Sequence, residues 1–388
     1  MFSVRCGTDW RWVAVGVLGL SAVGLADGGL FVVTGSAADL AQIRQEAVMA
    51  LEDDAVVYVL RSLYEGTANE LAWVMPLPET PTDIVALADS RLFEALDYET
   101  RPRFSVGSFR PSGCGCAAAG GGGGGALTQV EASGQAGPYD WAALTSSGAD
   151  SLLTWLNDHG YDVPASAEDI LDGYIDAGMH FLAVQVREEA GLSTEDVREI
   201  PPLQFRVATT RRFYPMAISA VSAAADTEVI LYVLGEHRAQ GANIPTGEID
   251  EASLVADPTS PSMTNYEQLF MARIAELGGL ALITESAGYP ILTPEDWPEG
   301  TFLENSASWF VTRLRTVVPR ELMTLDFELE DAATDDYVSN YFYLEDQDQT
   351  LTSMALGPVG VLCVCGAWKT YRRRRRRSPT GVGRSGDE

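Results

Sequence analysis

The stretch EAVMALEDDAVVYVLRSLY, residues 46–64, decides the fold class. Two strand-like runs, 46–51 and 55–64, flank Asp53 and Asp54. Because aspartate is a good turn former, this pattern predicts a β-hairpin. Apolar and polar residues alternate only partly in the second run, which predicts that one face of the hairpin is buried.

Further strand-like runs lie on both sides of this hairpin, with helical patterns between them. Strands are predicted over residues 28–34, 70–75, 103–106, 127–132, 179–187, 203–208, 216–221, 228–234, 280–284 and, as an edge strand, 326–330, whereas 309–318 is ambiguous. Helices are predicted over 90–96, 150–159, 167–177 and 264–277, with Asp150 and Ser166 as caps. Pro76 and Pro78 are expected to end the strand over 70–75. Strands in runs with helices inserted between them favour an α+β fold with mostly antiparallel sheet over a parallel βαβ fold.

The start of the chain has the pattern of a secretory signal peptide, residues 1–26. Arg5 and Arg11 precede an apolar run of residues 13–25, and the small residue Ala26 stands before Asp27. We therefore expect cleavage between Ala26 and Asp27. The run is short for a membrane span, although an uncleaved signal anchor is the alternative.

The other end of the chain has the pattern of a membrane anchor. The segment from Leu351 to Trp368 contains no charged residue, and as a helix its length is about 27 Å, just enough for the hydrocarbon core. A basic cluster follows almost at once: Lys369, Arg372, Arg373, Arg374, Arg375, Arg376 and Arg377. Such a cluster stays on the cytoplasmic side, so it acts as the topology signal. The alternative is a buried C-terminal helix with a basic tail.

The charges divide the chain in the same way. The net charge is −29, yet residues 27–368 hold 52 of the 55 acidic residues and only 16 of the 26 basic ones. An acidic body excludes non-specific nucleic-acid binding, which needs Lys and Arg to displace counterions. We expect an exported ectodomain over 27–350, one transmembrane helix over 351–368 and a basic cytoplasmic tail over 369–388, with the lipid bilayer as a partner.

Candidate chemistry is sparse. Cys114 and Cys116 lie in a glycine-rich segment, residues 107–126, that we expect to be a flexible loop. The pair could hold half of a metal site with a histidine, form a disulfide or mixed redox state, or have no role. Five cysteines are too few for a disulfide scaffold.

Two further groups of polar residues have ordinary explanations. The histidines are scattered: His159 is expected at a helix C-terminus, His180 in an apolar strand and His237 in a turn. No metalloprotease or hydrolase motif is present, although a catalytic site assembled in space stays possible. The acidic residues between 326 and 336 could bind Ca²⁺, but they lack the order of an EF-hand loop, and a solvated strand edge is the preferred interpretation.

Several motifs resemble the bacterial domain of unknown function numbered 2330. They are DGGLF at 27–31, ELAWVMPLP at 70–78, RLFEAL at 91–96, the Cys-Gly-Cys loop, WLN at 155–157 with GY at 160–161, and GMHFLA at 178–183. The resemblance runs from about residue 27 to 325. It implies an exported bacterial protein, often with a C-terminal membrane segment, and it transfers no catalytic residue. Members usually open with cysteines around Gly-Gly-Phe-Phe, where this chain has Asp27 and Val32, so any disulfide those cysteines make is absent here.

These observations predict a non-enzymatic protein of the bacterial cell envelope. It would cross the cytoplasmic membrane once, with its ectodomain on the outer side, and act as a structural or partner-binding module without a cofactor. Another envelope protein is a candidate partner. The alternative is an envelope enzyme or metal-dependent module that uses Cys114 and Cys116 with a histidine.

Overall fold

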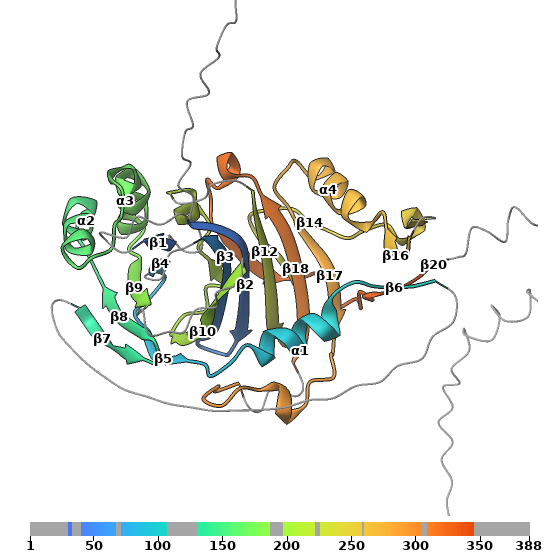
Figure 1. The fold of residues 1–388 in the computed structure, drawn as a ribbon, viewed down its shortest axis with the longest axis horizontal. Helices are drawn as coiled ribbons and strands as arrows, with labels where there is room; N and C mark the ends of the chain where they lie inside the picture. The colour runs from blue at the N-terminus through green and yellow to red at the C-terminus, as the bar shows by residue number, and fades with distance from the viewer. Residues whose placement is uncertain are drawn as a thin grey trace, which may run out of the picture.

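Two large β-sheets form the body of the molecule (Figure 1). The structure, a computed structural model, describes residues 30–32, 40–66, 71–106, 130–186, 197–221, 226–257, 260–303 and 309–344. The larger sheet has the strand order β14-β17-β18-β12-β2-β3-β10-β5. Its strands are β14 (Thr246–Gly247), β17 (Leu282–Gly288), β18 (Phe310–Val318), β12 (Thr227–Gly235), β2 (Leu40–Leu51), β3 (Val56–Gly66), β10 (Val197–Val207) and β5 (Pro81–Ala86).

The predicted hairpin lies at the centre of this sheet. Strands β2 and β3 pair antiparallel from Leu51 opposite Val56 onward, and the backbone N–H of Glu52 donates to the carbonyl of Ala55 across the turn, 2.9 Å. Strand β12 pairs with β2 in parallel, while its other neighbour, β18, is antiparallel. The hairpin therefore begins a mixed sheet in which most pairings are antiparallel.

The second sheet has five strands in the order β1-β4-β9-β8-β7. They are β1 (Leu30–Val32), β4 (Leu71–Leu77), β9 (His180–Val186), β8 (Tyr139–Leu144) and β7 (Val130–Ala136), and every pairing among them is antiparallel. Strand β4 continues through Pro76, which was expected to end it. Proline is tolerated there because β1 pairs only with residues 71–73, so Pro76 lies beyond the end of that neighbour.

Smaller sheets and helices complete the fold. A three-stranded sheet has the order β11 (Phe213–Tyr214), β19 (Phe327–Asp331), β13 (Ala239–Gly241), and two further pairs are β15 (Ala256–Asp257) with β16 (Ser260–Thr264) and β6 (Arg103–Val106) with β20 (Tyr341–Leu344). The α-helices are α1 (Arg91–Thr100), α2 (Ala149–Asp158), α3 (Glu168–Asp176) and α4 (Tyr266–Glu276). Short 3-10 helices are η1 (Ala165–Ala167), η3 (Ala217–Val221), η4 (Glu251–Ser253), η5 (Pro294–Asp296) and η6 (Arg320–Leu322).

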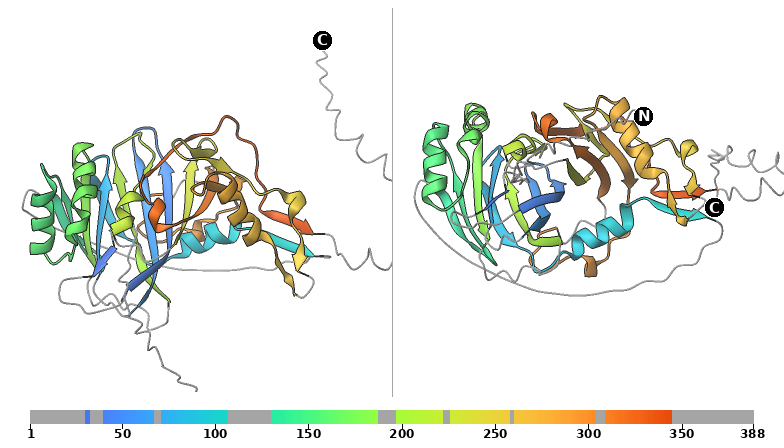
Figure 2. Two further views of the ribbon diagram at one scale, coloured as in Figure 1. Left: turned by 90° about the horizontal axis from the view of Figure 1, so that it is seen from above. Right: turned by 45° about the horizontal axis from the view of Figure 1, so that its top comes forward.

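The layers are helices, sheet, sheet and helices. The inner faces of the two sheets share one core, to which Trp73 and Val184 contribute from one sheet and Tyr58 and Leu231 from the other. Helices α2 and α3 cover the outer face of the five-stranded sheet, α1 packs on the outer face of the larger sheet, and α4 packs near β17. Figure 2 shows α2 and α3 at one end of the molecule and the β6–β20 pair at the other. The predicted α+β class with mostly antiparallel sheet is confirmed.

Two predicted elements differ from the structure. Residues 216–221, expected as a strand, contain the 3-10 helix η3. Of the residues expected as an edge strand, 326–330, those from Phe327 onward belong to β19, the central strand of its sheet. In the first case the carboxylate of Asp326, distant in the sequence, caps the helix. In the second, the short strands β11 and β13, which the chain supplies much earlier, cover both edges.

The predicted helix caps also differ. The N-cap positions of α2 and α3 are Gly148 and Ala167 rather than Asp150 and Ser166, and neither makes a side-chain cap. Instead, the carboxylate of Asp172 in α3 accepts a hydrogen bond from the backbone N–H of Ala149, 2.9 Å. A partner on the neighbouring helix thus replaces a local cap.

The predicted transmembrane helix lies outside the described residues, and so do the predicted signal peptide and the glycine-rich loop. Among the helices that the structure does describe, none is both long enough and apolar enough to span a bilayer.

Candidate functional site

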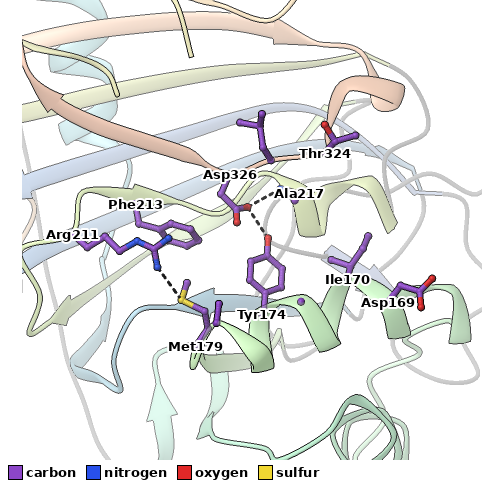
Figure 3. A pocket seen from close by; sticks show the side chains of 12 residues that line it. Asp169, Ile170, Tyr174, Met179, Arg211, Phe213, Ala217, Thr324 and Asp326 are labelled. Atoms are coloured by element: carbon purple, nitrogen blue, oxygen red, sulfur yellow. Dashed lines mark hydrogen bonds between the residues drawn. The ribbon is translucent and has the colours of Figure 1, made fainter. Parts of the chain in front are cut away.

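A cavity of about 270 Å³ lies between α3, β11 and the segment that leads into β19 (Figure 3). Its lining combines apolar side chains with a few polar ones. The lining residues are Asp169, Ile170, Gly173, Tyr174, Ala177, Met179, Arg211, Phe213, Ala217, Thr324, Leu325 and Asp326. A concave, mostly apolar space with a few convergent polar groups is the usual form of a small-molecule site, so this cavity is a candidate binding site.

Asp326 is the central polar group of this cavity. Its Oδ1 accepts hydrogen bonds from the hydroxyl of Tyr174, 2.6 Å, and from the backbone N–H groups of Met216 and Ala217, 2.8 and 2.9 Å. Burial raises the pKa of the Asp326 carboxyl, and these three donors only partly oppose the rise. Burial also raises the pKa of Tyr174 well above its usual range, with the neighbouring Asp326 as the next cause.

These contacts give Asp326 a structural task. Two of its donors are backbone N–H groups at the start of η3, which have no partner within a helix, so the carboxylate caps that helix from a distant part of the chain. Arg211, the other charged group beside it, is likewise engaged: its guanidinium bonds Glu328, and its Nη1 lies 3.4 Å from the sulfur of Met179. The cavity has room for a small ligand, but Asp326 and Arg211, the two charged groups at its centre, already hold protein partners.

A row of ion pairs crosses the outer face of the larger sheet, the face on which α1 and α4 pack. We call this row the charge ladder. In the order of their contacts its members are Glu199, Arg61, Glu46, Arg44, Glu228, Arg315, Glu285, Arg313 and Asp97. Acidic and basic side chains meet because the register puts Arg44 opposite Glu228 and Glu46 opposite Arg61 on neighbouring strands.

The centre of the charge ladder is buried. The side chains of Glu285 and Arg313 are 1% and 5% exposed, and the carboxylate accepts from Arg313 Nε at 2.7 Å, Arg315 Nη1 at 3.3 Å and the hydroxyl of Tyr266 at 2.9 Å. Burial alone would raise the pKa of Glu228, yet Arg315 and Arg44 together hold it below its usual value. At Glu199, the first member of the ladder, the net effect on the pKa is opposite. Burial raises the pKa of Glu199, and the nearby Arg61 only partly offsets this rise.

The three histidines occupy separate places. His159 ends α2, as predicted, and stacks on Trp155 with ring centres 4.0 Å apart. His180 begins β9, half-buried, with its Nδ1 2.7 Å from the hydroxyl of Thr80 and 3.6 Å from a carboxylate oxygen of Glu131. Thr80 in turn donates to Glu131. The environment of His180 is thus more polar than the apolar strand predicts.

His237 lies in an exposed turn and bonds Asp335, Nδ1 to Oδ2, at 2.9 Å. The hydrogen bond to Asp335 raises the pKa of His237, and the same bond lowers the pKa of Asp335. No contact joins any two histidines in the part of the chain that the structure describes. Within that part, no group of three or more His, Cys, Asp or Glu side chains could hold a metal ion.

The carboxylates of the acidic stretch that was considered for Ca²⁺ bind side chains of the protein itself. Glu328 bonds Arg211, Glu330 accepts from Gln240, and Asp331 bonds Arg212, all along β19. Glu328 and Glu330 lie on one face of β19 and Asp331 on the other, and each of the three carboxylates is held by a different side chain. Side-chain pairing along a strand, rather than a cation site, accounts for this run.

The predicted site residues of the glycine-rich segment and of the two chain ends lie outside the described residues. These are Cys114 and Cys116, the cleavage pair Ala26 and Asp27, the anchor limits Leu351 and Trp368, and the cluster of Lys369 with the arginines at 372–377. Sequence reasoning missed the charge ladder. Its one local signal is the repeat of charge at alternate residues, as in Arg44 with Glu46 and Arg313 with Arg315, which puts both members of each pair on the same face of a strand.

Comparisons with known proteins identify a family but no activity. No curated protein matches the chain. Among solved structures, the crystal structure of baculovirus P35 aligns with a TM-score of 0.31 at 9% identity, over 77% of this chain and 96% of that one, and a likeness this low carries no inference. The model of a family described as "Uncharacterized protein conserved in bacteria (DUF2330)" matches residues 23–329. This match spans most of both sheets and their helices, and the chain therefore belongs to the bacterial family DUF2330.

Proposed function

We propose that this protein is a non-enzymatic component of the bacterial cell envelope. A single C-terminal segment, residues 351–368, anchors it in the cytoplasmic membrane, and its ectodomain lies on the outer side, where it bears structural load or binds another envelope protein. No cofactor takes part in this role.

The observation that carries the proposal is the place where the chain leaves the described fold. Strand β20 ends at Leu344, and only six residues separate it from Leu351, the first residue of the apolar segment. Tyr341 and Tyr343 on this strand are 43% and 81% exposed. Tyrosine is enriched at membrane–water interfaces, so this edge of the fold has the chemistry expected of residues next to an anchor.

The charge ladder supports a structural rather than a catalytic role. The acidic and basic side chains that are most buried in the described fold, Glu46, Glu285 and Arg313, make ion pairs with one another or with their neighbours in the ladder. Groups held in such pairs maintain the packing of α1 on the sheet. This use of charge fits a rigid scaffold.

Membrane extraction tests the proposal. The full chain should stay in the membrane pellet after an alkaline carbonate wash, whereas a chain that stops after Thr350 should appear in the soluble exported fraction. Edman sequencing of the mature protein should begin at Asp27. Full release of the complete chain by carbonate would contradict the anchor, and a mature protein that keeps Met1 would contradict the cleaved signal.

One observation favours the alternative, a metal-dependent or enzymatic module. His180 lies beside the hydroxyl of Thr80 and the carboxylate of Glu131, and an imidazole with a hydroxyl on one side is a recurring arrangement in acid–base chemistry. Cys114 and Cys116 would supply further ligands in this hypothesis. Metal analysis of the purified chain separates the two functions: we expect no stoichiometric transition metal, and a bound metal that is lost in a Cys114→Ser, Cys116→Ser variant would favour the alternative.

A further inference from the structure

One end of the described fold carries an unusual concentration of exposed aromatic and apolar side chains. We call it the tyrosine surface and define it as Tyr98, Tyr289, Ile291, Tyr337, Tyr341 and Tyr343. Their exposed fractions run from 43% for Tyr341 to 81% for Tyr343. Large side chains rarely stay this exposed in a group unless the surface has a partner.

Contacts of Arg103 and Asn340 join one half of this surface to the end of α1. The guanidinium carbon of Arg103 lies 4.2 Å from the ring centre of Tyr98 and 5.0 Å from that of Tyr341, and Arg103 donates to the hydroxyl of Tyr341. The side-chain amide of Asn340 donates to the carbonyls of Glu99 and Arg101, both at 2.9 Å. The segment that carries Tyr341 and Tyr343 is therefore fixed against the last turn of α1.

The other half is joined through the end of β17. Val338 exchanges two backbone hydrogen bonds with Ala287, 2.9 and 3.0 Å, which brings Tyr337 over Gly288. A Cβ at Gly288 would lie 2.5 Å from the Tyr337 ring, so only glycine allows this close approach. The backbone N–H of Ile291 lies 3.4 Å from a carboxylate oxygen of Glu99, which ties this half to α1 as well.

The backbone under the surface is held by buried aromatic packing. Phe342, which alternates with the exposed Tyr341 and Tyr343 on β20, points inward and stacks on Phe104 of β6 with ring centres 5.5 Å apart. Tyr266 of α4 packs beside both rings, at 5.4 Å from Phe104 and 6.1 Å from Phe342. The exposed tyrosines are thus presented on a fixed platform.

We propose that the tyrosine surface lies in the headgroup region of the outer leaflet and holds the ectodomain in one orientation on the membrane. This inference rests on the proposed membrane anchor. The chain from Leu344 to Leu351 spans at most about 25 Å when fully extended, so the end of β20 cannot lie farther than that from the start of the proposed anchor. Tyrosine has an apolar ring and a polar hydroxyl, which is the combination that partitions to this region.

The charged residues around the tyrosine surface indicate the headgroup charge of the lipid that it contacts. Glu99 lies beside the surface, and Asp335 and Asp336 precede Tyr337 directly, with Asp335 bonded to His237. The nearby cations are engaged as well, because Arg101 pairs with Asp97 and Arg103 stacks on two tyrosine rings. An acidic rim is repelled by anionic headgroups. Contact should therefore depend on the aromatic rings and should occur on zwitterionic phosphatidylcholine bilayers without help from anionic lipid.

Hydroxyl-radical footprinting of the full chain in phosphatidylcholine vesicles tests this inference. A protease site inserted after Thr350 allows the same preparation to be labelled before and after the body is released from its anchor. We expect oxidation of Tyr341 and Tyr343, relative to the exposed His159 on α2 at the opposite end of the molecule, to rise at least about threefold on release. Replacing a third of the lipid by phosphatidylglycerol should not increase the protection.

Two variants separate the rings from the rest of the surface. In a Tyr341→Ser, Tyr343→Ser chain, Tyr98 and Tyr289 should lose their protection in vesicles, whereas a matched Tyr341→Phe, Tyr343→Phe chain should keep it. Equal oxidation before and after release would overturn the inference while leaving the anchor intact. Protection that persists in the released body would show that protein covers the surface, and protection that needs anionic lipid would show that charge, not the rings, binds it; both overturn the proposal. Extraction of the intact chain by carbonate would instead overturn the proposed anchor and this inference with it.

Discussion

Neutralising Glu285 should be among the most damaging single changes to this fold. Its carboxylate lies between two guanidinium groups, Arg313 at 2.7 Å and Arg315 at 3.3 Å, with the hydroxyl of Tyr266 as a third donor. The substitution Glu285→Gln keeps the shape of the side chain but removes the negative charge. Arg313, whose side chain is 5% exposed, would then retain only the half-exposed carboxylate of Asp97 as an acidic partner in the ladder.

The expected cost follows from burial. Removing one partner of a buried ion pair typically costs about 3–5 kcal/mol, because the remaining charge stays buried without full compensation. With a urea m-value of about 3 kcal/mol/M for a domain of this size, the unfolding midpoint should fall by about 1–1.7 M. Tryptophan fluorescence can follow the transition, since Trp73 is fully buried in the shared core.

Two controls make the result specific. Glu276→Gln removes a similar charge from an exposed pair with Arg273, and such pairs contribute about 0–1 kcal/mol, so the midpoint should hardly move. The double variant Glu285→Leu, Arg313→Met replaces the central pair by apolar groups and should recover part of the loss. If Glu285→Gln costs no more than Glu276→Gln, the charge ladder does not stabilise the fold and the reasoning fails.

Three further changes have defined outcomes. Asp326→Ala should cost about 1–3 kcal/mol of unfolding free energy because the cap of η3 is lost, whereas Asp326→Asn keeps an acceptor. Since burial raises the folded-state pKa of Asp326, its contribution to stability is fully present below the ordinary pKa of aspartate and is lost as pH rises through the raised value. Urea titrations should therefore show the Asn variant gaining on the wild type across that interval and no further change above it. The His237–Asp335 bond should stabilise the fold fully between the ordinary pKa of aspartate and the ordinary pKa of histidine. This stabilisation is lost as pH rises through the raised pKa of His237, and it is also lost as pH falls through the lowered pKa of Asp335. In an NMR titration, Asp335→Asn should lower the pKa of His237, and an unchanged value would refute the contact. Replacing the arginines at 372–377 by Gln should release the protein or scramble its topology, whereas Arg384→Gln should not, as carbonate washing and protease mapping can check.

Local sequence patterns were sufficient to predict the elements whose hydrogen-bond partners lie close by in the sequence. The hairpin of β2 and β3 and the helices α1 to α4 follow from turn residues and apolar spacing within a few residues. The order of strands in the larger sheet does not follow, because it places β12 beside β2 and β10 beside β3, segments separated by long stretches of chain. Register across such distances is set by packing of the whole sheet, which a single sequence does not encode locally.

The site residues show the same division. Residues 216–221 have the composition of a strand, but Asp326 caps the first turn from more than a hundred residues away, and the resulting 3-10 helix cannot be predicted from the segment itself. The charge ladder likewise needs the strand register before Arg44 and Glu228 can be recognised as partners. The exposure of Tyr337 could not be predicted from the sequence either, because it depends on how the segment after β19 pairs with Ala287.

The orientation of the chain in the membrane is the central claim, and protease mapping of spheroplasts tests it most directly. With an epitope placed at the C-terminus, added protease should digest the body and leave a protected fragment that contains the anchor and the arginine tail. The same fragment should disappear when detergent opens the membrane. A body that resists protease in intact spheroplasts, but is digested after lysis, would place the ectodomain inside the cell and contradict the account.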